Sequence, residues 1–122
     1  MPNASDVVTR YLTSLADSDL DEARSLLADD FSFMGPGMTT ALDKEAFLTE
    51  FGGKYRFVRE LRMLRQLEDA GEVCSLYEFD VETRAASTTF LMTEWNTVRD
   101  GQVASSLLVF DTAVGAQLHQ HT

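Results

Sequence analysis

One acidic residue, Glu94, interrupts the apolar positions of a strand-like segment. Glu94 shares strand parity with Phe90 and Met92, so its side chain is expected on the face that packs against a core. A carboxylate in that place is costly unless it is paired, neutralised or used in chemistry. Proton transfer is the chemistry that a positioned carboxyl group performs. Glu94 is therefore the first candidate for a functional residue.

Two interpretations of Glu94 remain open from the sequence. In the first, the carboxylate reaches solvent at a sheet edge or pairs with an arginine. Arg59 is the candidate partner because it shares strand parity with Phe57 and Leu61, although a solvated strand also explains this arginine. In the second, apolar neighbours keep the acid neutral, so that it can donate a hydrogen bond to a ligand oxygen.

Tyrosines from two other segments are expected beside Glu94. Tyr11 lies on the apolar stripe of a predicted helix, and its hydroxyl needs a partner if it is buried. Tyr77 lies on a predicted strand, and a symmetric turn over residues 84–87 would place it directly opposite Glu94. Packing alone also explains each tyrosine.

A small α+β domain must position these side chains. Helices come first and strands second, which predicts helices on one face of a curved antiparallel sheet. The expected elements are a helix over 5–16, a short helix from Leu20 that ends at Asp29 and Asp30, a strand over 31–34, a helix from an Asp43 cap to Gly52-Gly53, and strands over 55–67, 72–83 and the two arms of 88–111. The expected turns are a three-residue loop over 69–71 and a two-residue turn at Asp100-Gly101.

Strand alternation assigns residues to the two faces of the sheet. With a two-residue turn at Asp100-Gly101, Leu107 would face Glu94 from the last strand. The predicted pocket lining is Tyr77, Asn96, Arg59, Met34, Met92, Phe79 and Leu107. The opposite face would carry Leu76, Leu91, Trp95, Leu108 and Phe110. No helix is left to cover that second apolar face, which predicts a homodimer.

Composition limits the classes of partner. The 122 residues predict a single domain over 1–113 and a flexible C-terminal tail over 114–122, in which His119 and His121 are expected to fray. A net charge of -10 argues against nucleic acid and anionic membranes. A single cysteine excludes an internal disulfide, and with no visible signal peptide we expect a cytoplasmic protein. No motif for a metal or a cofactor is present, so neither is expected.

Two stretches of the chain resemble a known family. Residues 6–33, DVVTRYLTSLADSDLDEARSLLADDFSF, are similar to the opening of the ketosteroid isomerase and SnoaL-like group within the nuclear transport factor 2-like superfamily. The VRDGQV turn and the VFD ending of the last hairpin resemble the closing strands of that group. The resemblance implies a cone, a cystatin-like α+β roll, in which the sheet wraps around three helices and encloses a pocket. It also implies a dimer through the outer sheet face.

Residue by residue, the resemblance is partial. Tyr11 falls where the isomerases keep the tyrosine of their oxyanion hole. Glu94 falls where they keep a protonated aspartate and where SnoaL-like cyclases keep an acid/base aspartate. The proton-shuttling carboxylate of the isomerases would fall at or beside Gly35, where none stands. Residues 105–107 lack the Glu-His-Trp that SnoaL-like chains often show. The sequence therefore argues against a standard ketosteroid isomerase and against a pocket histidine.

Two functional classes follow for a pocket that takes a small apolar or aromatic ligand. One is a cofactor-independent cyclase or isomerase that acts on an apolar carbonyl compound by proton transfer. Glu94 would then be the acid/base, and Tyr11 would polarise the carbonyl oxygen. The alternative is a non-catalytic ligand-binding or dimerisation module of the same fold.

Overall fold

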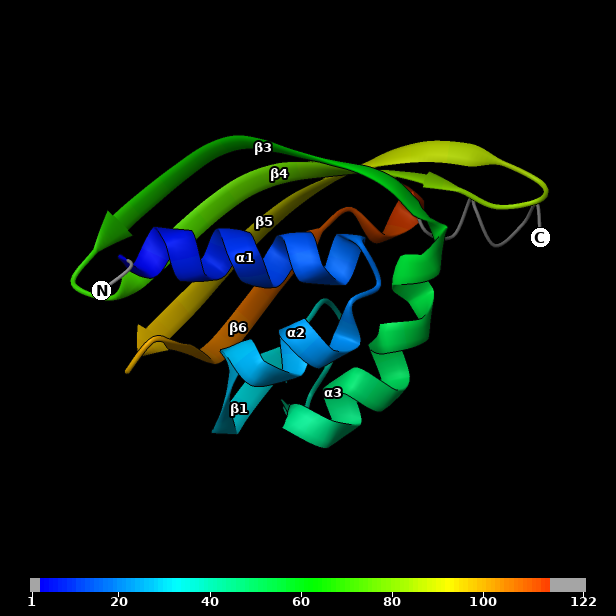
Figure 1. Cartoon of the computed structure of the whole chain (residues 1–122). Coiled ribbons are helices and arrows are strands. Elements are labelled where there is room, and N and C mark those ends of the chain that lie inside the picture. Colours follow the sequence, from blue (N-terminus) through cyan, green and yellow to red (C-terminus); the bar gives the residue numbers. More distant parts are fainter. Residues whose placement is uncertain (1–2, 115–122) are drawn as a thin grey trace.

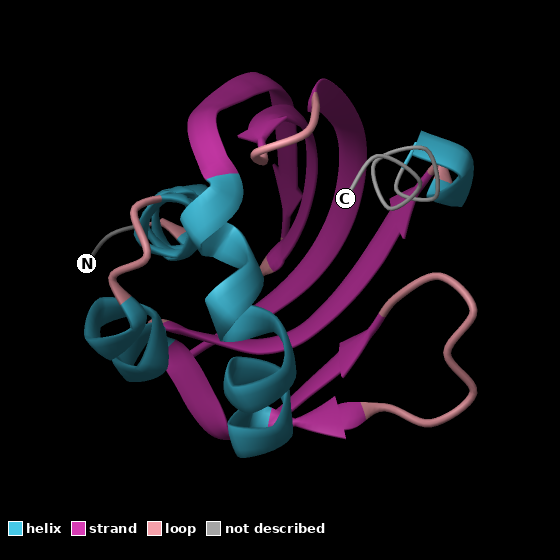
Figure 2. Ribbon diagram, turned by 90° about the vertical axis from the view of Figure 1, so that its right-hand side faces the viewer, coloured by secondary structure: helices cyan, strands magenta, loops and turns pink. Residues whose placement is uncertain are grey.

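The structure of the chain, a computed structural model, describes residues 3–114. The helices lie on one side of a strongly bent sheet (Figures 1 and 2). The elements in chain order are α1 (Ala4–Ala16), α2 (Leu20–Leu26), β1 (Leu27–Met34), β2 (Leu42–Asp43), α3 (Lys44–Phe51), the 3-10 helix η1 (Gly52–Phe57), β3 (Val58–Asp69), β4 (Glu72–Glu82), β5 (Ser87–Arg99) and β6 (Gln102–Phe110). This order confirms the α+β class. The expected tail residues His119 and His121 lie outside the described residues.

The six strands form one sheet in the order β2-β1-β6-β5-β4-β3. Every neighbouring pair is antiparallel except β1 and β6, which are parallel, so the sheet is mixed and not wholly antiparallel. The expected strand over 31–34 in fact begins at Leu27, and Asp29 and Asp30 belong to it instead of ending the preceding helix. Both aspartates are exposed, so the strand keeps its charged positions in solvent.

The segment expected to be one long strand over 55–67 contains two elements. The helical path of α3 continues through Gly52 as η1, and extended backbone begins only at Val58. Aromatic contacts hold this path against the core: the Phe51 ring lies 5.8 Å from Phe47, and the Tyr55 ring lies 6.0 Å from Phe79. Burial of these rings outweighs the helix-stopping tendency of the glycine pair.

Two tight turns fix the register at one end of the sheet. Asp100 and Gly101 have φ of 55° and 76°, which are the values of a two-residue turn between antiparallel strands. Ala70 and Gly71 have φ of 51° and 84°, and Asp69 already pairs with Glu72. The turn between β3 and β4 therefore also has two residues, Ala70 and Gly71, where the sequence predicted a three-residue loop.

The pairing of β4 with β5 differs from the symmetric-turn expectation by two residues. Tyr77 pairs with Met92, and Ser75 is the residue directly opposite Glu94. Because side chains alternate with a period of two, a shift of two residues leaves every side chain on its predicted face. The predicted neighbours of Glu94 on β4 are thus retained.

A β-bulge in β6 changes which of its side chains point to the inner face of the sheet. Val98 pairs with Val103, but Thr97 pairs with Ser105, so the register slips by one residue at Ala104. Leu107 therefore lies opposite Trp95, on the outer face, and is 50% exposed. Its predicted place in the pocket lining is wrong. The same slip places Leu108 and Phe110 on the inner face, where they pack against the core. Their predicted place on the outer face is therefore wrong.

Helix α1 crosses the inner face of the sheet (Figure 1). The Asn3 side chain caps it by accepting a hydrogen bond from the backbone N–H of Asp6. Its buried residues are Val7, Val8, Tyr11, Leu12, Ser14 and Leu15. Among residues 3–114, no helix is long and apolar enough to span a membrane.

Candidate functional site

Glu94 lies on β5 and is only 3% exposed. Its carboxylate points to the inner face, which α1 covers, and Tyr77 and Asn96 lie on the same face. The three tyrosines of the chain come from α1, η1 and β4, and each feels the charge of Glu94. The Glu94 carboxyl group thus lies close enough to all three phenol groups to raise their pKa values.

Three side chains donate hydrogen bonds to the Glu94 carboxylate. The Tyr77 hydroxyl lies 2.6 Å from Oε1, the Ser106 hydroxyl lies 2.7 Å from Oε2, and the Asn96 Nδ2 lies 3.0 Å from Oε2. These donors offset the cost of burying the polar carboxyl group. Oε2 therefore anchors the group, while Oε1 accepts from Tyr77 alone and has a lone pair left.

The tyrosines near Glu94 hold their protons strongly. Burial raises the pKa of Tyr77 well above its usual value, and the neighbouring negative charge of Glu94 raises it further. Burial and the Glu94 charge raise the pKa values of Tyr11 and Tyr55 in the same way. Each phenol therefore keeps its proton at ordinary pH; that of Tyr77 is donated to Glu94, and those of Tyr11 and Tyr55 are not.

Several predicted site residues do gather here. Tyr77 donates to Glu94, Asn96 does the same, and Phe79 and Met92 are buried on the same face, with the Phe79 ring 5.1 Å from that of Tyr77. Tyr11 is buried close enough to feel the Glu94 charge, but the donors to Glu94 are the three side chains above and not Tyr11. The expected hydrogen bond between Tyr11 and Glu94 is absent.

Other predicted site residues lie elsewhere. Arg59 is exposed and donates to the backbone carbonyl of Arg56, 3.1 Å away, so it does not pair with Glu94. Met34 pairs with Leu107 and alternates with the buried Phe33, which turns its side chain to the outer side of the sheet. Leu107, as described above, is an outer-face residue.

Two residues of the site were not predicted from the sequence. Ser106 donates to Glu94, but an inward Leu107, as predicted, implies by regular alternation that Ser105 and not Ser106 faces inward, because the bulge at Ala104 was not foreseen. Tyr55 was assigned to a strand, and its place in η1 brings it to Phe79. A glycine or a proline often marks a bulge, and this one has neither.

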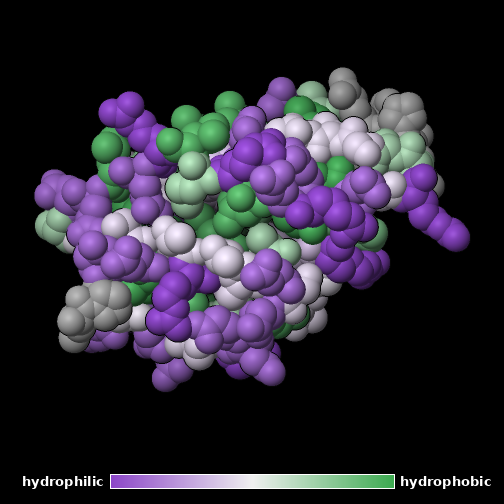
Figure 3. Space-filling view, turned by 45° about the horizontal axis from the view of Figure 1, so that its top comes forward, coloured by the Kyte–Doolittle hydropathy of each residue, from purple (hydrophilic) through white to green (hydrophobic). Residues whose placement is uncertain are grey.

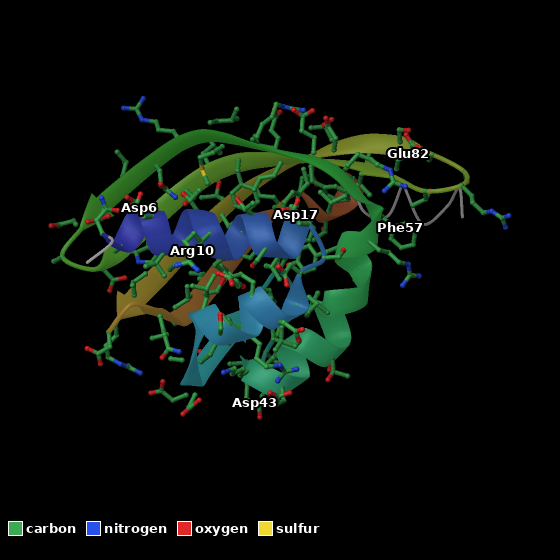
Figure 4. The ribbon with its side chains drawn as sticks, viewed as in Figure 1. Asp6, Arg10, Asp17, Asp43, Phe57 and Glu82 are labelled. Carbon is green, nitrogen blue, oxygen red and sulfur yellow. The ribbon has the colours of Figure 1, made fainter. Side chains whose placement is uncertain are left out.

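Two hollows of the described surface have linings that do not include Glu94. One of about 270 Å³ lies between α1 and α2 beside Arg10 and Asp17, and one of about 420 Å³ lies beside Arg59 and Glu82. Figure 4 labels Arg10 and Asp17 on α1, and Glu82 at the far end of the long strands. Aromatic rings instead lie beside Glu94: the Tyr77 ring, whose hydroxyl donates to Glu94, lies 5.1 Å from that of Phe79, and the Phe79 ring lies 6.0 Å from that of Tyr55.

Residues 8–106 match the family model of the SnoaL-like domain. The chain belongs to this SnoaL-like family. A search of curated proteins finds no match.

Solved structures share the SnoaL-like fold at low identity. A putative polyketide cyclase from Streptomyces antibioticus is 20% identical with a TM-score of 0.77, over 97% of this chain and 99% of that one. An epoxide hydrolase of the LEH-like type from M. tuberculosis is 19% identical with a TM-score of 0.80, over 97% and 90% of the two chains. TerC, co-crystallised with polyporic acid, is 16% identical with a TM-score of 0.78, over 96% and 98%. These likenesses concern the fold.

Proposed function

We propose that this SnoaL-like chain binds a small apolar carbonyl compound and transfers a proton on it, with Glu94 as the acid/base. The observation that carries the proposal is the buried Glu94 carboxylate, held at Oε2 by Ser106 and Asn96 and left with a free lone pair at Oε1. A positioned base with one open acceptor site is what proton abstraction needs. The polyketide cyclase and the polyporic acid complex among the neighbours support a small-molecule ligand for this fold.

The chemical step follows from the two oxygens of Glu94. Oε1 takes a proton from the carbon next to the ligand carbonyl, and the electron pair of that C–H bond moves into an enolate. The neutral phenol of Tyr11, whose proton is not donated to Glu94, donates a hydrogen bond to the developing enolate oxygen. Glu94 then returns the proton to carbon, or to the product of ring closure, and the cycle balances without a cofactor.

The packed interior sets a condition on this proposal. Aromatic side chains lie beside Glu94, with Tyr77 bonded to it and the Phe79 ring 5.1 Å from that of Tyr77, so a ligand must displace some of them. Helix α1 with Tyr11 and the 3-10 helix η1 with Tyr55 are the parts of the wall outside the sheet. Burial of an aromatic ligand against the remaining rings would offset that displacement.

A second candidate, a ligand-binding module without turnover, is favoured by one observation. At Gly35, where the isomerases would carry a carboxylate, an added Cβ would lie 3.3 Å from the Phe33 ring and 3.5 Å from Met38 Sδ. This position is closed by apolar side chains and offers no second acid. A one-carboxylate site can still shuttle a proton, which keeps the enzymatic proposal first.

The test is substitution of Glu94 by Gln, which keeps the shape but cannot transfer a proton. A panel of aromatic polyketide-like and steroid-like ketones is assayed for binding and for exchange of the α-proton with deuterium in heavy water. The proposal expects Glu94→Gln to abolish exchange while affinity stays within about tenfold, or ~1.4 kcal/mol. The matched control is Glu50→Gln, because Glu50 is exposed on α3.

The outcomes separate the two candidates. Exchange that survives Glu94→Gln would refute Glu94 as the acid/base. Ketone binding without any exchange by the wild type would favour the binding module instead.

We further propose that two copies associate through the outer face of the sheet. The large exposed apolar residues of β5 and β6 are Leu91, Trp95, Leu107 and Val109, and they are 50–57% exposed. Figure 3, which brings the top of the molecule forward, shows exposed hydrophobic residues among hydrophilic ones on the upper part of the molecule as well. The Trp95 Nε1 donates to Glu72 Oε2 at 2.8 Å, which holds the indole in a fixed orientation.

A further inference from the structure

The side chain of Asn96 has one atom without a partner. Asn96 is 0% exposed, and its Nδ2 donates to Glu94 Oε2 at 3.0 Å and to the Ser105 carbonyl oxygen at 3.3 Å. Its Oδ1 accepts from no group, and it is the one buried side-chain polar atom of residues 3–114 left in that state. Such an atom needs an explanation, since buried polar groups are almost always hydrogen-bonded.

The orientation of the Asn96 amide is fixed by its neighbours. Rotating the amide by a half turn would place Oδ1 against the Glu94 carboxylate and the Ser105 carbonyl oxygen, which are both acceptors. Two acceptor–acceptor contacts would replace two hydrogen bonds. The donors are therefore committed to the protein, and the oxygen is the part of Asn96 that is left for something else.

The free oxygen belongs to the same cluster as the reacting group. Asn96 and Glu94 are two residues apart on one face of β5 and are bonded to each other, and Glu94 Oε1 also has a free lone pair. Both open sites are acceptors. A ligand that satisfies the cluster must bring a proton to Glu94 and a separate hydrogen-bond donor to Asn96.

We propose that Asn96 Oδ1 accepts a hydrogen bond from a hydroxyl or N–H group of the ligand, so that the site selects carbonyl compounds that carry such a donor. This inference rests on the proposed ketone site and names the class of compound that it takes. A ligand that lacks the donor leaves Oδ1 unpaired when it is bound, and that difference is the source of the selectivity.

The test compares α-tetralone, a bicyclic aromatic ketone, with its ring-hydroxylated isomers and their methyl ethers. Affinity is measured by isothermal titration calorimetry on the full chain. We expect at least one hydroxytetralone to bind about tenfold or more tightly than both α-tetralone and its own methyl ether. In the Asn96→Leu variant, which removes the acceptor, the difference should fall to about twofold or less.

A matched variant separates the acceptor from its neighbour. Ser106→Ala removes another donor to Glu94 Oε2 but leaves Asn96 Oδ1 in place. It should lower all the affinities and keep the preference for the hydroxyl. A second readout is the side-chain amide signal of Asn96 in nitrogen-15 spectra, which should shift with the hydroxytetralone and not with α-tetralone. This readout uses the wild type and stands even if Asn96→Leu fails to fold.

Each result decides something. Equal affinity of the wild type for α-tetralone and every hydroxytetralone would overturn the inference, leave the ketone site standing, and mean that a buried water satisfies Oδ1. Loss of the preference in Ser106→Ala to the same extent as in Asn96→Leu would also overturn it, because the effect would then pass through Glu94. No binding of any tetralone would instead overturn the ketone site, and the inference with it.

Discussion

The two faces of the sheet reverse the usual distribution of polar and apolar residues. The inner face buries a carboxylate, an amide and two serine hydroxyls, Ser75 and Ser106, among aromatic rings. The outer face exposes Trp95 and three large aliphatic residues of β5 and β6 to solvent. The inner face can keep its polar groups because hydrogen bonds satisfy all of them except Asn96 Oδ1, whereas the outer apolar side chains have no cover within residues 3–114. This contrast is the basis for proposing a ligand site on the inner face and an interface on the outer face.

The largest expected effect is the unequal cost of truncating one apolar side chain on each face. Phe79→Ala on the inner face should lower the free energy of unfolding by about 3–5 kcal/mol, because it leaves a cavity among packed rings. Leu91→Ala on the outer face should cost about 0.5 kcal/mol or less, because Leu91 is already exposed. Urea unfolding of both variants in a Trp95→Arg background, which removes association, measures the difference. Equal costs would show that the two faces are packed alike.

The inner face should also make the fold sensitive to alkali. The pKa values of Tyr11, Tyr55 and Tyr77 are raised by burial and by Glu94, so above pH ~10 the unfolded chain loses phenol protons that the folded chain keeps. Stability is therefore full below that pH and falls as the pH rises, by about 1.4 kcal/mol per pH unit for each such tyrosine. Absorbance at the phenolate band should change only as the chain unfolds. A tyrosine that titrates near its ordinary value in the folded chain would contradict the raised pKa values of these phenols.

The outer face should respond in association and not in protomer stability. Trp95→Arg places a charge at the centre of the exposed apolar residues and should convert a dimer into a monomer in analytical ultracentrifugation at micromolar concentration. An interface of standard size would bury on the order of 1,200–2,000 Å² in total. The charge-matched control is Thr49→Arg, at an exposed position of α3, which should remain dimeric. A wild-type monomer, or a dimeric Trp95→Arg, would refute this choice of interface.

The smallest effect concerns the charged border of the outer face. Arg62 lies 2.5 Å from Asp80 and also contacts Glu60 and Glu78. The hydrogen bond from Arg62, with a smaller contribution from Thr89, lowers the pKa of Asp80 to about 2. Its small contribution to stability is present above the ordinary aspartate pKa and is lost as the pH falls toward 2. Carboxyl titration by NMR should show Asp80 moving upward in Arg62→Gln, and an unchanged midpoint would contradict the ion pair.

Local signals in the sequence were enough to predict most of the fold. The apolar stripe of α1, the Asp43 cap of α3, the Asp100-Gly101 turn and the alternation along β4 and β5 are each written in neighbouring residues. The same alternation placed Glu94, Tyr77 and Asn96 on one face. A two-residue error in the β4–β5 register did not matter, because strand side chains repeat every two residues.

The sequence by itself determined that a carboxylate would sit on the inner face of a curved sheet under a helix. Only the tertiary structure decided which groups would meet it. The bulge at Ala104 moved Ser106 in and Leu107 out, the continuation of α3 into η1 carried Tyr55 to the core, and Arg59 remained in solvent. These outcomes depend on contacts between segments far apart in the chain, where the burial of aromatic rings and the satisfaction of one buried charge outweigh local preference.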